Sequence, residues 1–244
     1  MSGYHGGFAD GYDGLMQGVD YAARADYLLQ VFARNGGVPQ SLLDLACGTG
    51  RLTRLLAAKG IEMIGVDGSA EMLCKAREAD PEGSVLWICQ DLRELDLYGT
   101  AGGAVSTLDS INHLWEDGDL SRFFDRLQYF IDPGGLFVLD ANTVYKHLQV
   151  LGDHTFVYDT PDAYCVWQNH TCPEQVTTRI SLDLFEREGE GYRRHREQFT
   201  ERGYTPEQIF AAAGGFEPVA VYGDLTWEPP AADCERMVLV LKKQ

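Results

Sequence analysis

Between residues 20 and 145 the apolar positions follow two alternating periods. Short apolar runs predict buried strands, and the segments between them have the three- and four-residue apolar spacing of helices. The first helical segment runs from Asp20 to Arg34 and is ended by Gly36-Gly37-Val38-Pro39. We expect strands at residues 41–46, 61–66, 85–89, 104–108 and 136–140, and helices between them at residues 49–59, 69–79 and 120–131. Ser69 is the expected N-cap of the second of these helices. Strands that alternate with helices predict a parallel sheet.

The pattern changes after residue 152. Four extended segments, with turn-forming residues between them, predict an antiparallel meander. They lie at residues 155–158, 164–170, 176–186 and 192–202. A helix at 205–213, with Thr205 as its cap and Pro206 in its first turn, precedes strands at 216–222 and 235–241.

The predicted fold class is therefore α/β: a doubly wound, mainly parallel seven-stranded sheet, Rossmann-like, with an antiparallel β insert in the C-terminal half. We expect residues 1–152 and 203–244 to form one domain. Residues 153–202 would then form an inserted lobe over the substrate.

One glycine-rich turn, Asp44-Leu-Ala-Cys-Gly-Thr-Gly50, joins the first of these strands to its helix. Gly48 and Gly50 let a ligand approach the backbone, and the helix start offers free N–H groups. The dinucleotide motif requires glycine where Thr53 stands, and no Gly-Lys-Ser or Gly-Lys-Thr follows. Because Asp44 would repel phosphate, the turn indicates a ligand that carries a cation and no phosphate.

Two further acids follow the next two strands. Asp67 stands where a carboxylate can accept hydrogen bonds from a ribose diol. Asp91, next to Leu92, can meet the exocyclic amine of an adenine. Together these positions describe a site for an adenosine with a cationic tail, and S-adenosylmethionine is such a ligand.

The segments 42–50, 65–73, 90–92 and 133–137 resemble, in order and spacing, the motifs of class I S-adenosylmethionine-dependent methyltransferases. The resemblance covers residues 20–145 and resumes over 205–241. Ala46 departs from the glycine that is usual there. The resemblance implies that the cofactor is S-adenosylmethionine. The residues expected to bind it are Tyr21, Asp44, Ala46, Gly48, Gly50, Asp67, Gly68, Met72, Asp91, Leu92 and Leu108.

The whole chain also resembles a group of uncharacterised bacterial methyltransferases, which gives no substrate. The shared segments are 12–16, 109–112, 167–169 and 227–230. We expect Tyr12, Asn112 and Trp167 to contact the substrate.

The segment from Leu108 to Leu114 resembles small-amine and aminosugar N-methyltransferases, which implies that His113 is a catalytic base or orients the nucleophile. The alternative is that His113 only caps a turn or packs against the insert. Tyr12 and Tyr21 resemble tyrosines that close over cofactor and substrate in the aminosugar enzymes, or they are packing residues. The segment lacks the Asn/Asp-Pro-Pro-Tyr/Phe motif of DNA amino-methyltransferases.

Charge narrows the class of acceptor. Twenty basic and 37 acidic residues give a net charge of −17, which counts against DNA and RNA. In the basic cluster Arg193–Arg196, strand alternation should send Arg194 and Arg196 to one face and Arg193 and His195 to the other. The cluster either binds a substrate anion or, as we favour, pairs with nearby acids. We therefore expect methyl transfer to nitrogen or oxygen of a small molecule. The alternatives are an RNA or protein acceptor, and a cofactor-binding module without turnover.

Three absences in the sequence bear on location and metal content. The chain has no run of 18 apolar residues, and its first twenty residues do not resemble a signal peptide. Its six cysteines contain no C-x-x-C, and its histidines are scattered. We expect a cytoplasmic protein that contacts no membrane and binds no metal. The oligomeric state does not follow from the sequence.

Overall fold

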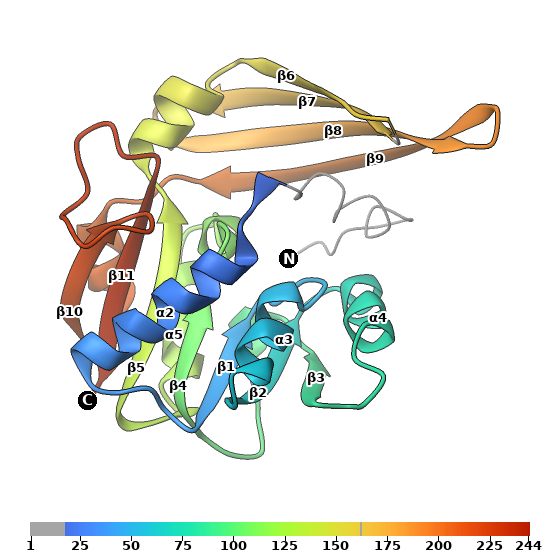
Figure 1. Ribbon diagram of the computed structural model, residues 1–244. Helices are drawn as coiled ribbons and strands as arrows, with labels where there is room; N and C mark the ends of the chain where they lie inside the picture. The colour runs from blue at the N-terminus through green and yellow to red at the C-terminus, as the bar shows by residue number, and fades with distance from the viewer. Residues whose placement is uncertain (1–17, 162) are drawn as a thin grey trace.

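The computed structural model describes residues 18–161 and 163–244, which form two β-sheets with flanking helices (Figure 1). The larger sheet has the order β10-β11-β5-β4-β1-β2-β3. Its strands are β1 (Ser41–Leu45), β2 (Glu62–Asp67), β3 (Val85–Cys89), β4 (Ala101–Ser106), β5 (Ile131–Asn142), β10 (Phe216–Gly223) and β11 (Arg236–Lys243). Strands β1 to β5 are parallel, whereas β11 is antiparallel to β5 and to β10. The predicted seven-stranded, mainly parallel sheet is confirmed.

Helices cover both faces of this sheet, as a doubly wound fold requires. They are α2 (Tyr21–Asn35), α3 (Arg51–Ala58), α4 (Ala70–Glu78), α5 (Asp119–Leu127) and α6 (Pro206–Ala212). Adjacent residues of β1 point into the hydrophobic cores on opposite faces of the sheet. Leu42 packs with residues of α2 and α3, and Leu43 packs with residues of α5 and α6. Within the described residues, no helix has both the length and the apolar character needed to cross a membrane.

The predicted helix caps are present. Ser69 accepts a hydrogen bond from the N–H of Met72 at the start of α4. Thr205 and Gln208 form a reciprocal capping box at the start of α6. Helices α4 and α6 therefore begin directly after the capping residues that the sequence predicted.

The strands on either side of α5 differ from the expected ones. β4 ends at Ser106 rather than residue 108, because Leu108 and Asp109 adopt left-handed conformations (φ 59° and 63°) that cannot continue a strand. β5 begins at Ile131 and passes through the Pro-Gly-Gly segment, with a register shift against β4. The helix predicted to reach residue 131 accordingly ends at Leu127.

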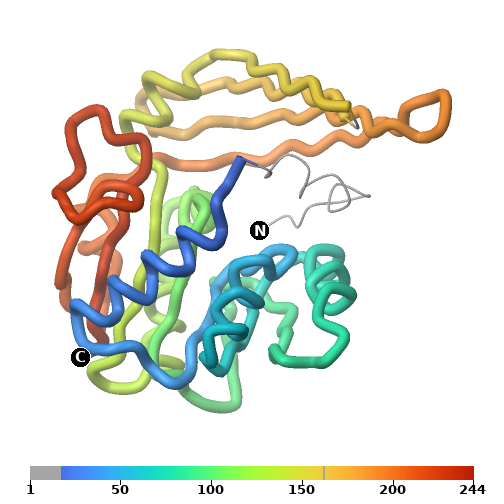
Figure 2. The backbone as a smooth tube through the Cα atoms, viewed as in Figure 1, coloured from blue at the N-terminus to red at the C-terminus, as the bar shows by residue number. Residues whose placement is uncertain are grey.

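The second sheet is the predicted antiparallel meander, β6 (Thr155–Asp159), β7 (Ala163–Cys172), β8 (Thr177–Glu188) and β9 (Gly191–Arg202). The chain leaves the first sheet after β5, through the short helix η4 (Lys146–Leu151), and returns after β9. The two crossings run side by side (Figure 2), joined by a bridge between Thr143 and Tyr204. Figure 1 shows this sheet lying across the end of the first sheet.

Alternation along β9 sends polar side chains to two different faces. His195, Glu197 and Glu201 are buried on one face, whereas Arg194 and Arg196 are exposed on the other. Both of these arginines pair with Asp183, at 2.7 and 2.8 Å. Arg193 pairs with Glu188. The basic cluster is therefore engaged by acids of its own sheet, as we favoured from the sequence.

Candidate functional site

The turn after β1 is built from left-handed residues. Ala46, Gly48 and Gly50 have φ of 60°, 56° and 71°. At Gly50 a Cβ would lie 2.3 Å from the ring of Trp87, so packing alone requires glycine there. At Gly48 a Cβ would meet no atom within 4 Å, so this backbone faces open space that a ligand can approach.

Asp67, the last residue of β2, holds this turn to the start of α4. One carboxylate oxygen accepts the N–H of Gly48 at 2.8 Å, and the other accepts the N–H of Ser69 at 2.7 Å. Burial raises the pKa of Asp67, although these two bonds oppose the rise. Each oxygen keeps a second lone pair, which a ribose hydroxyl could use.

Asp44 is buried at the end of β1. Its carboxylate accepts a 2.6 Å hydrogen bond from the hydroxyl of Thr53, the residue that replaces the third glycine of the dinucleotide motif. Burial raises the pKa of Asp44 to about 6, partly opposed by the Thr53 bond and increased by the charge of Asp67. A cationic ligand group near this carboxyl would favour its ionised form.

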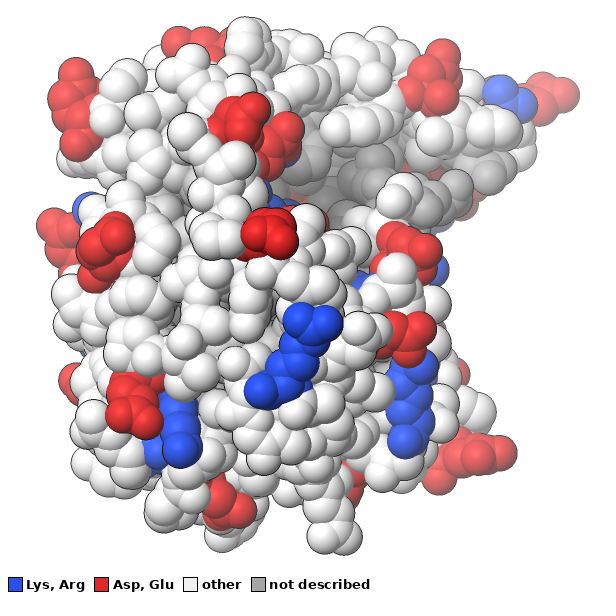
Figure 3. Space-filling model, turned by 60° about the vertical axis from the view of Figure 1, so that its left-hand side comes forward, with Lys and Arg blue, Asp and Glu red and all other residues white. Residues whose placement is uncertain are grey.

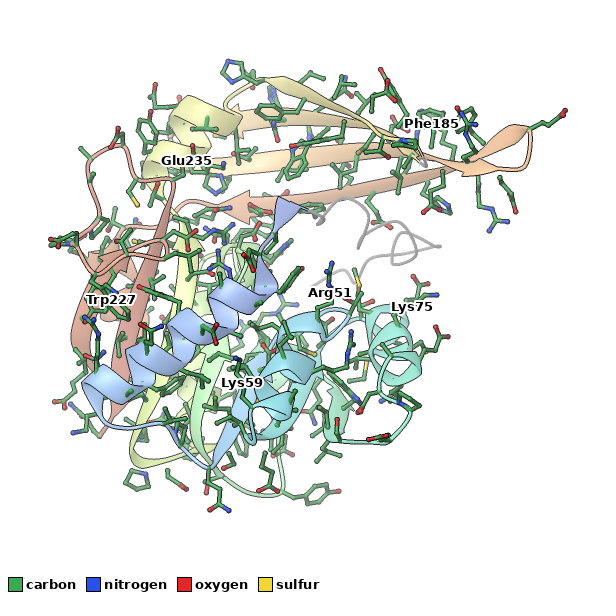
Figure 4. The ribbon with its side chains drawn as sticks, in the orientation of Figure 1. Arg51, Lys59, Lys75, Phe185, Trp227 and Glu235 are labelled. Carbon is green, nitrogen blue, oxygen red and sulfur yellow. The ribbon has the colours of Figure 1, made fainter. Side chains whose placement is uncertain are left out.

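A pocket opens beside these acids. Its lining residues are Tyr21, Asp44, Ala46, Cys47, Gly48, Thr49, Arg51, Leu52, Thr107, Leu108 and Ser110. The guanidinium of Arg51 lies 4.5 Å from the ring centroid of Tyr21, and Figure 4 shows Arg51 pointing from the start of α3 toward the second sheet. A carboxyl and a guanidinium in one pocket match the ammonium and carboxylate of an amino acid.

This pocket brings together five of the expected cofactor residues: Tyr21, Asp44, Ala46, Gly48 and Leu108. Of the others, Gly50 ends the turn after β1 at the start of α3. The remaining five, Asp67, Gly68, Met72, Asp91 and Leu92, lie at or after the ends of β2 and β3. Gly68 separates Asp67 from Ser69, and Met72 is buried in a cluster that includes Ile180 and Leu182 of the second sheet.

Asp91 and Leu92 follow β3 but are arranged differently from expectation. The Asp91 carboxylate pairs with the guanidinium of Arg93 at 2.6 Å. Burial would raise the pKa of Asp91, but Arg93 outweighs it and holds the pKa below the usual range. The Leu92 side chain is fully buried in the main core, so the contact with adenine that we expect of Leu92 would have to come from its backbone.

The loop after β4 is fixed by Asp140 of β5, which the sequence did not single out. Its carboxylate accepts the backbone N–H groups of Leu108 at 2.9 Å and Asp109 at 3.1 Å. Arg24 of α2 and Arg236 of β11 pair with the same carboxylate at 3.2 and 2.6 Å. These partners are far apart in the chain, so no local pattern could have indicated them.

His113 ends the short helix η3 (Ser110–His113) that this loop forms. Its ring packs against Phe199 of β9, with centroids 5.1 Å apart. Its Nε2 lies 3.8 Å from a carboxylate oxygen of Glu201. Burial lowers the pKa of His113, so the neutral imidazole, which can accept a proton, predominates near neutral pH.

Asn112 is occupied by the fold. Its Nδ2 donates to the carbonyls of Asn142 (2.9 Å) and Arg202 (2.7 Å), and its Oδ1 accepts the N–H of Asn142 at 2.8 Å. The side chain is fully buried. It thus ties η3 to β5 and β9, and the structure leaves it little capacity for the expected substrate contact.

Trp167 lies on the buried side of β7, and its indole N–H donates to Asn169 at 2.6 Å. Its ring packs edge-on against Phe156. Tyr12 lies outside the described residues. No group of three or more His, Cys, Asp or Glu side chains within the described ranges is placed to hold a metal ion.

Comparison with known proteins adds three kinds of likeness. Residues 42–135 match the family model of a methyltransferase domain. The chain is 30% identical over 241 residues to the putative methyltransferase YqeM of Bacillus subtilis. That alignment covers 97% of this chain and 96% of the relative. A crystal structure of an S-adenosylmethionine-dependent methyltransferase from Clostridium acetobutylicum superimposes with a TM-score of 0.88 at 30% identity, covering 97% of each chain.

Two similar proteins have more specific names. The glycine/sarcosine N-methyltransferase of Halorhodospira halochloris is 28% identical over 251 residues, covering 99% of this chain and 89% of the relative. A dTDP-3-amino-3,6-dideoxy-alpha-D-glucopyranose N,N-dimethyltransferase of Streptomyces fradiae is 32% identical over 139 residues, 56% of this chain and 54% of the relative.

Proposed function

The chain belongs to the class I S-adenosylmethionine-dependent methyltransferases, and we propose that it methylates an amino nitrogen of a small molecule. S-adenosylmethionine is the cofactor, and when bound it supplies an activated methyl group on a sulfonium. The protein then has to align the acceptor, exclude water and take up a proton.

The pocket residues fit this cofactor. We assign Asp67 to the ribose hydroxyls, because one of its oxygens bonds the turn at Gly48, the other bonds Ser69, and each keeps a second lone pair. Asp44 and Arg51 would hold the ammonium and carboxylate of the methionine moiety. Asp91, just after the end of β3, is the carboxylate we assign to the adenine amine.

The observation that carries the proposal is a buried imidazole, His113, at the end of the short helix η3, which begins at the pocket residue Ser110. An amine attacks only through an unprotonated nitrogen, and the product nitrogen must then lose a proton. We infer that His113 takes that proton, and its lowered pKa, caused by burial, supports this because it keeps the imidazole neutral.

The named relatives support the same choice, since the names of both refer to transfer to nitrogen. An RNA acceptor is less well supported, because Arg193, Arg194 and Arg196 are paired with acids. On the face drawn in Figure 3, basic side chains are separated and interspersed with acidic ones. We therefore place the acceptor among small amines, such as amino acids or aminosugars.

The test is transfer of a labelled methyl group to matched acceptors. Glycine, sarcosine and the dTDP-linked 3-aminosugar would be compared with glycolate and the corresponding 3-hydroxy sugar nucleotide. We expect transfer to at least one amine and none to its hydroxyl analogue, with the methyl group located on nitrogen by mass spectrometry. Transfer only to a hydroxyl, or only to RNA or protein, would contradict the proposal. Cofactor binding without transfer to any of these would favour a non-catalytic module.

His113→Gln provides the internal check. We expect kcat to fall about 100-fold, the usual contribution of one general base, with no change in the Kd of S-adenosylmethionine. A kcat equal to that of wild type would leave His113 as a packing residue.

A further inference from the structure

A cavity of about 600 Å³ lies against the loop of residues 224–235, which joins β10 to β11. Its other walls include Asn142 at the end of β5, Lys146 of η4 and Arg236 at the start of β11. Small-molecule sites have volumes of this order. Among the described residues, none lines both this cavity and the cofactor pocket, so the cavity is a separate binding space.

The loop that forms one wall of the cavity is anchored at both ends. Near its start the ring of Trp227 packs on Tyr27 of α2, with centroids 4.8 Å apart, and the guanidinium of Arg34 lies 3.7 Å from the centroid of the Trp227 ring. At its end Glu235 pairs with Lys146 of η4. Figure 4 shows Trp227 beside α2 and Glu235 beside η4. The cavity is therefore preformed by the fold, as ligand sites usually are.

Both cations on the walls of the cavity already face carboxylates. Lys146 pairs with Glu235, which is itself a lining residue. Arg236 pairs with Asp140 at 2.6 Å and with Asp109 at 3.4 Å. An anion entering the cavity would therefore meet cations whose charge is already balanced.

The other two lining acids differ in their partners. Asp224 accepts two hydrogen bonds from the guanidinium of Arg24, at 3.0 and 3.1 Å. Glu228 has no ion pair among the described residues. A carboxylate in a cleft without a balancing cation attracts positive charge, so the lining favours a cationic ligand.

Asn142 supplies a second, independent indication. It is 4% exposed, and its Oδ1 finds no hydrogen-bond partner among the described residues. Its amide nitrogen is engaged, because the side chain hydrogen bonds to Glu201. A buried polar atom without a partner is costly. Since Asn142 lines the cavity, an N–H group bound there would supply the missing donor.

The cavity adjoins the cofactor pocket at one wall. Leu108 and Ser110 line the cofactor pocket, and Asp109 stands between them in the chain. The carboxylate of Asp109 pairs with Arg236, which lines the cavity. A ligand in the cavity therefore lies close to the loop that carries the proposed reaction site.

We propose that this cavity is a binding site for an ammonium group, with Glu228 as the opposite charge and Oδ1 of Asn142 as a hydrogen-bond acceptor. Pro229 and Ala231, which also line the cavity, would cover the carbon chain attached to the nitrogen. The inference goes beyond the proposed function, because it concerns a ligand outside the cofactor pocket. The ammonium group belongs either to the acceptor, as a second amino group, or to a separate amine.

The decisive experiment is a calorimetric titration of the full chain with putrescine, a four-carbon diamine. The protein is first saturated with S-adenosylhomocysteine, so that Asp44 of the cofactor pocket is not available to the probe. Butanediol and succinate, which have the same chain length, replace the cation by a neutral group and by an anion. We expect saturable binding of putrescine and about tenfold weaker binding, or none, for the other two. No saturable binding of putrescine, or equal binding of all three, would overturn the inference.

Two single-charge variants of the loop test the role of Glu228. Glu228→Gln should weaken putrescine binding about threefold or more, as expected for an exposed ion pair. Asp233→Asn removes the same charge from an exposed residue of the same loop that is not among the lining residues, and it should bind putrescine as wild type does. Equal losses in the two variants would show only the effect of total charge and would overturn the inference.

A pair of alanine substitutions tests the location without changing charge. Ala231→Leu places a larger side chain on the wall of the cavity and should weaken putrescine binding. Ala232→Leu, at the next position, enlarges a residue that lines only a smaller neighbouring pocket, and it should leave the binding unchanged. Unchanged binding in Ala231→Leu would place the amine elsewhere and overturn the inference.

Kinetics distinguish the two sources of the ammonium group. If the acceptor carries it, putrescine should compete with the acceptor, and Glu228→Gln should raise the KM of the acceptor with little change in kcat. If a separate amine carries it, putrescine should change the rate without competing. The calorimetric titration requires no acceptor, so failure of every amine in the transfer assay would overturn the proposed function and leave the result for the cavity standing.

Discussion

The carboxylate of Asp140, on β5, accepts the backbone N–H of Leu108 across 2.9 Å, and so one strand of the sheet fixes the loop that follows its neighbour. The same carboxylate binds the N–H of Asp109. Both residues of this loop are left-handed without being glycine. The hydrogen bonds from Asp140 therefore stabilise a backbone conformation that is unfavourable for residues with a side chain. His113 lies in the helical turn that follows these two residues.

Asp140→Asn should destabilise the protein by about 3–5 kcal/mol. The change leaves the buried guanidinium of Arg24 and the half-buried guanidinium of Arg236 facing a neutral amide. Removal of one partner of a buried ion pair has this cost. The measurement is the free energy of unfolding in urea. Asp183→Asn, which weakens the exposed pairs with Arg194 and Arg196, is the control and should cost less than about 1 kcal/mol. Equal losses for the two variants would contradict the role given to Asp140.

The same residue contributes to acid stability. Burial alone would raise the pKa of Asp140, but Arg236, Arg24 and two backbone N–H groups outweigh it and hold the pKa below the usual range. A carboxyl whose pKa is depressed on folding stabilises the protein above its unfolded pKa. That stability is lost as pH falls through the folded pKa. Wild type should therefore lose more stability than Asp140→Asn on going from pH 5 to about pH 2.

The sequence was informative wherever a signal is local. The strand–helix alternation, the caps at Ser69 and Thr205, and the opposite faces of Arg193 and Arg194 all follow from spacing of a few residues. The end of β4 was misplaced because the apolar run continues to Leu108, and the left-handed turn there depends on Asp140, 32 positions away. Glu201 was missed for the same reason: alternation places it on a face but does not say what that face meets.

Ala46→Gly should stabilise the protein by about 1 kcal/mol. Ala46 stands at φ 60°, a conformation in which a Cβ is strained by about 1–2 kcal/mol, and the greater entropy of glycine in the unfolded chain offsets only part of this. Urea unfolding would measure the change. Ala57→Gly, within α3, should have the opposite sign, because glycine lowers stability in a helix. A destabilised Ala46→Gly would show that the turn is not strained.

Asp67→Ala should weaken the binding of S-adenosylmethionine and of S-adenosylhomocysteine by about tenfold or more. The change removes the acceptor proposed for the ribose and releases the N–H groups of Gly48 and Ser69. Charged hydrogen bonds of this kind are worth about 1.5–3 kcal/mol. Calorimetric titration is the measurement. Asp26→Ala, an exposed acid on α2 paired with Lys59, should bind both ligands as wild type does.

Cofactor affinity should depend on pH through Asp44. Burial raises the pKa of this carboxyl to about 6, and a cationic ligand group binds its ionised form. The affinity for S-adenosylmethionine should therefore be nearly constant above pH 7 and fall as pH drops below 6. Asp44→Asn should bind more weakly at pH 8 and lose this dependence. An identical pH profile in wild type and Asp44→Asn would exclude Asp44 as the group responsible.

Arg51→Met separates the two halves of the cofactor site. Arg51 lines the same pocket as Asp44 and is the guanidinium we assign to the carboxylate of the methionine moiety. Its loss should weaken S-adenosylhomocysteine by about tenfold or more. It should leave the affinity for adenosine unchanged, because adenosine has no amino acid. Lys59→Met, beyond the other end of α3, tests whether any lost cation has this effect and should bind both ligands normally. A parallel loss of adenosine binding in Arg51→Met would mean that Arg51 supports the turn as a whole rather than the methionine carboxylate.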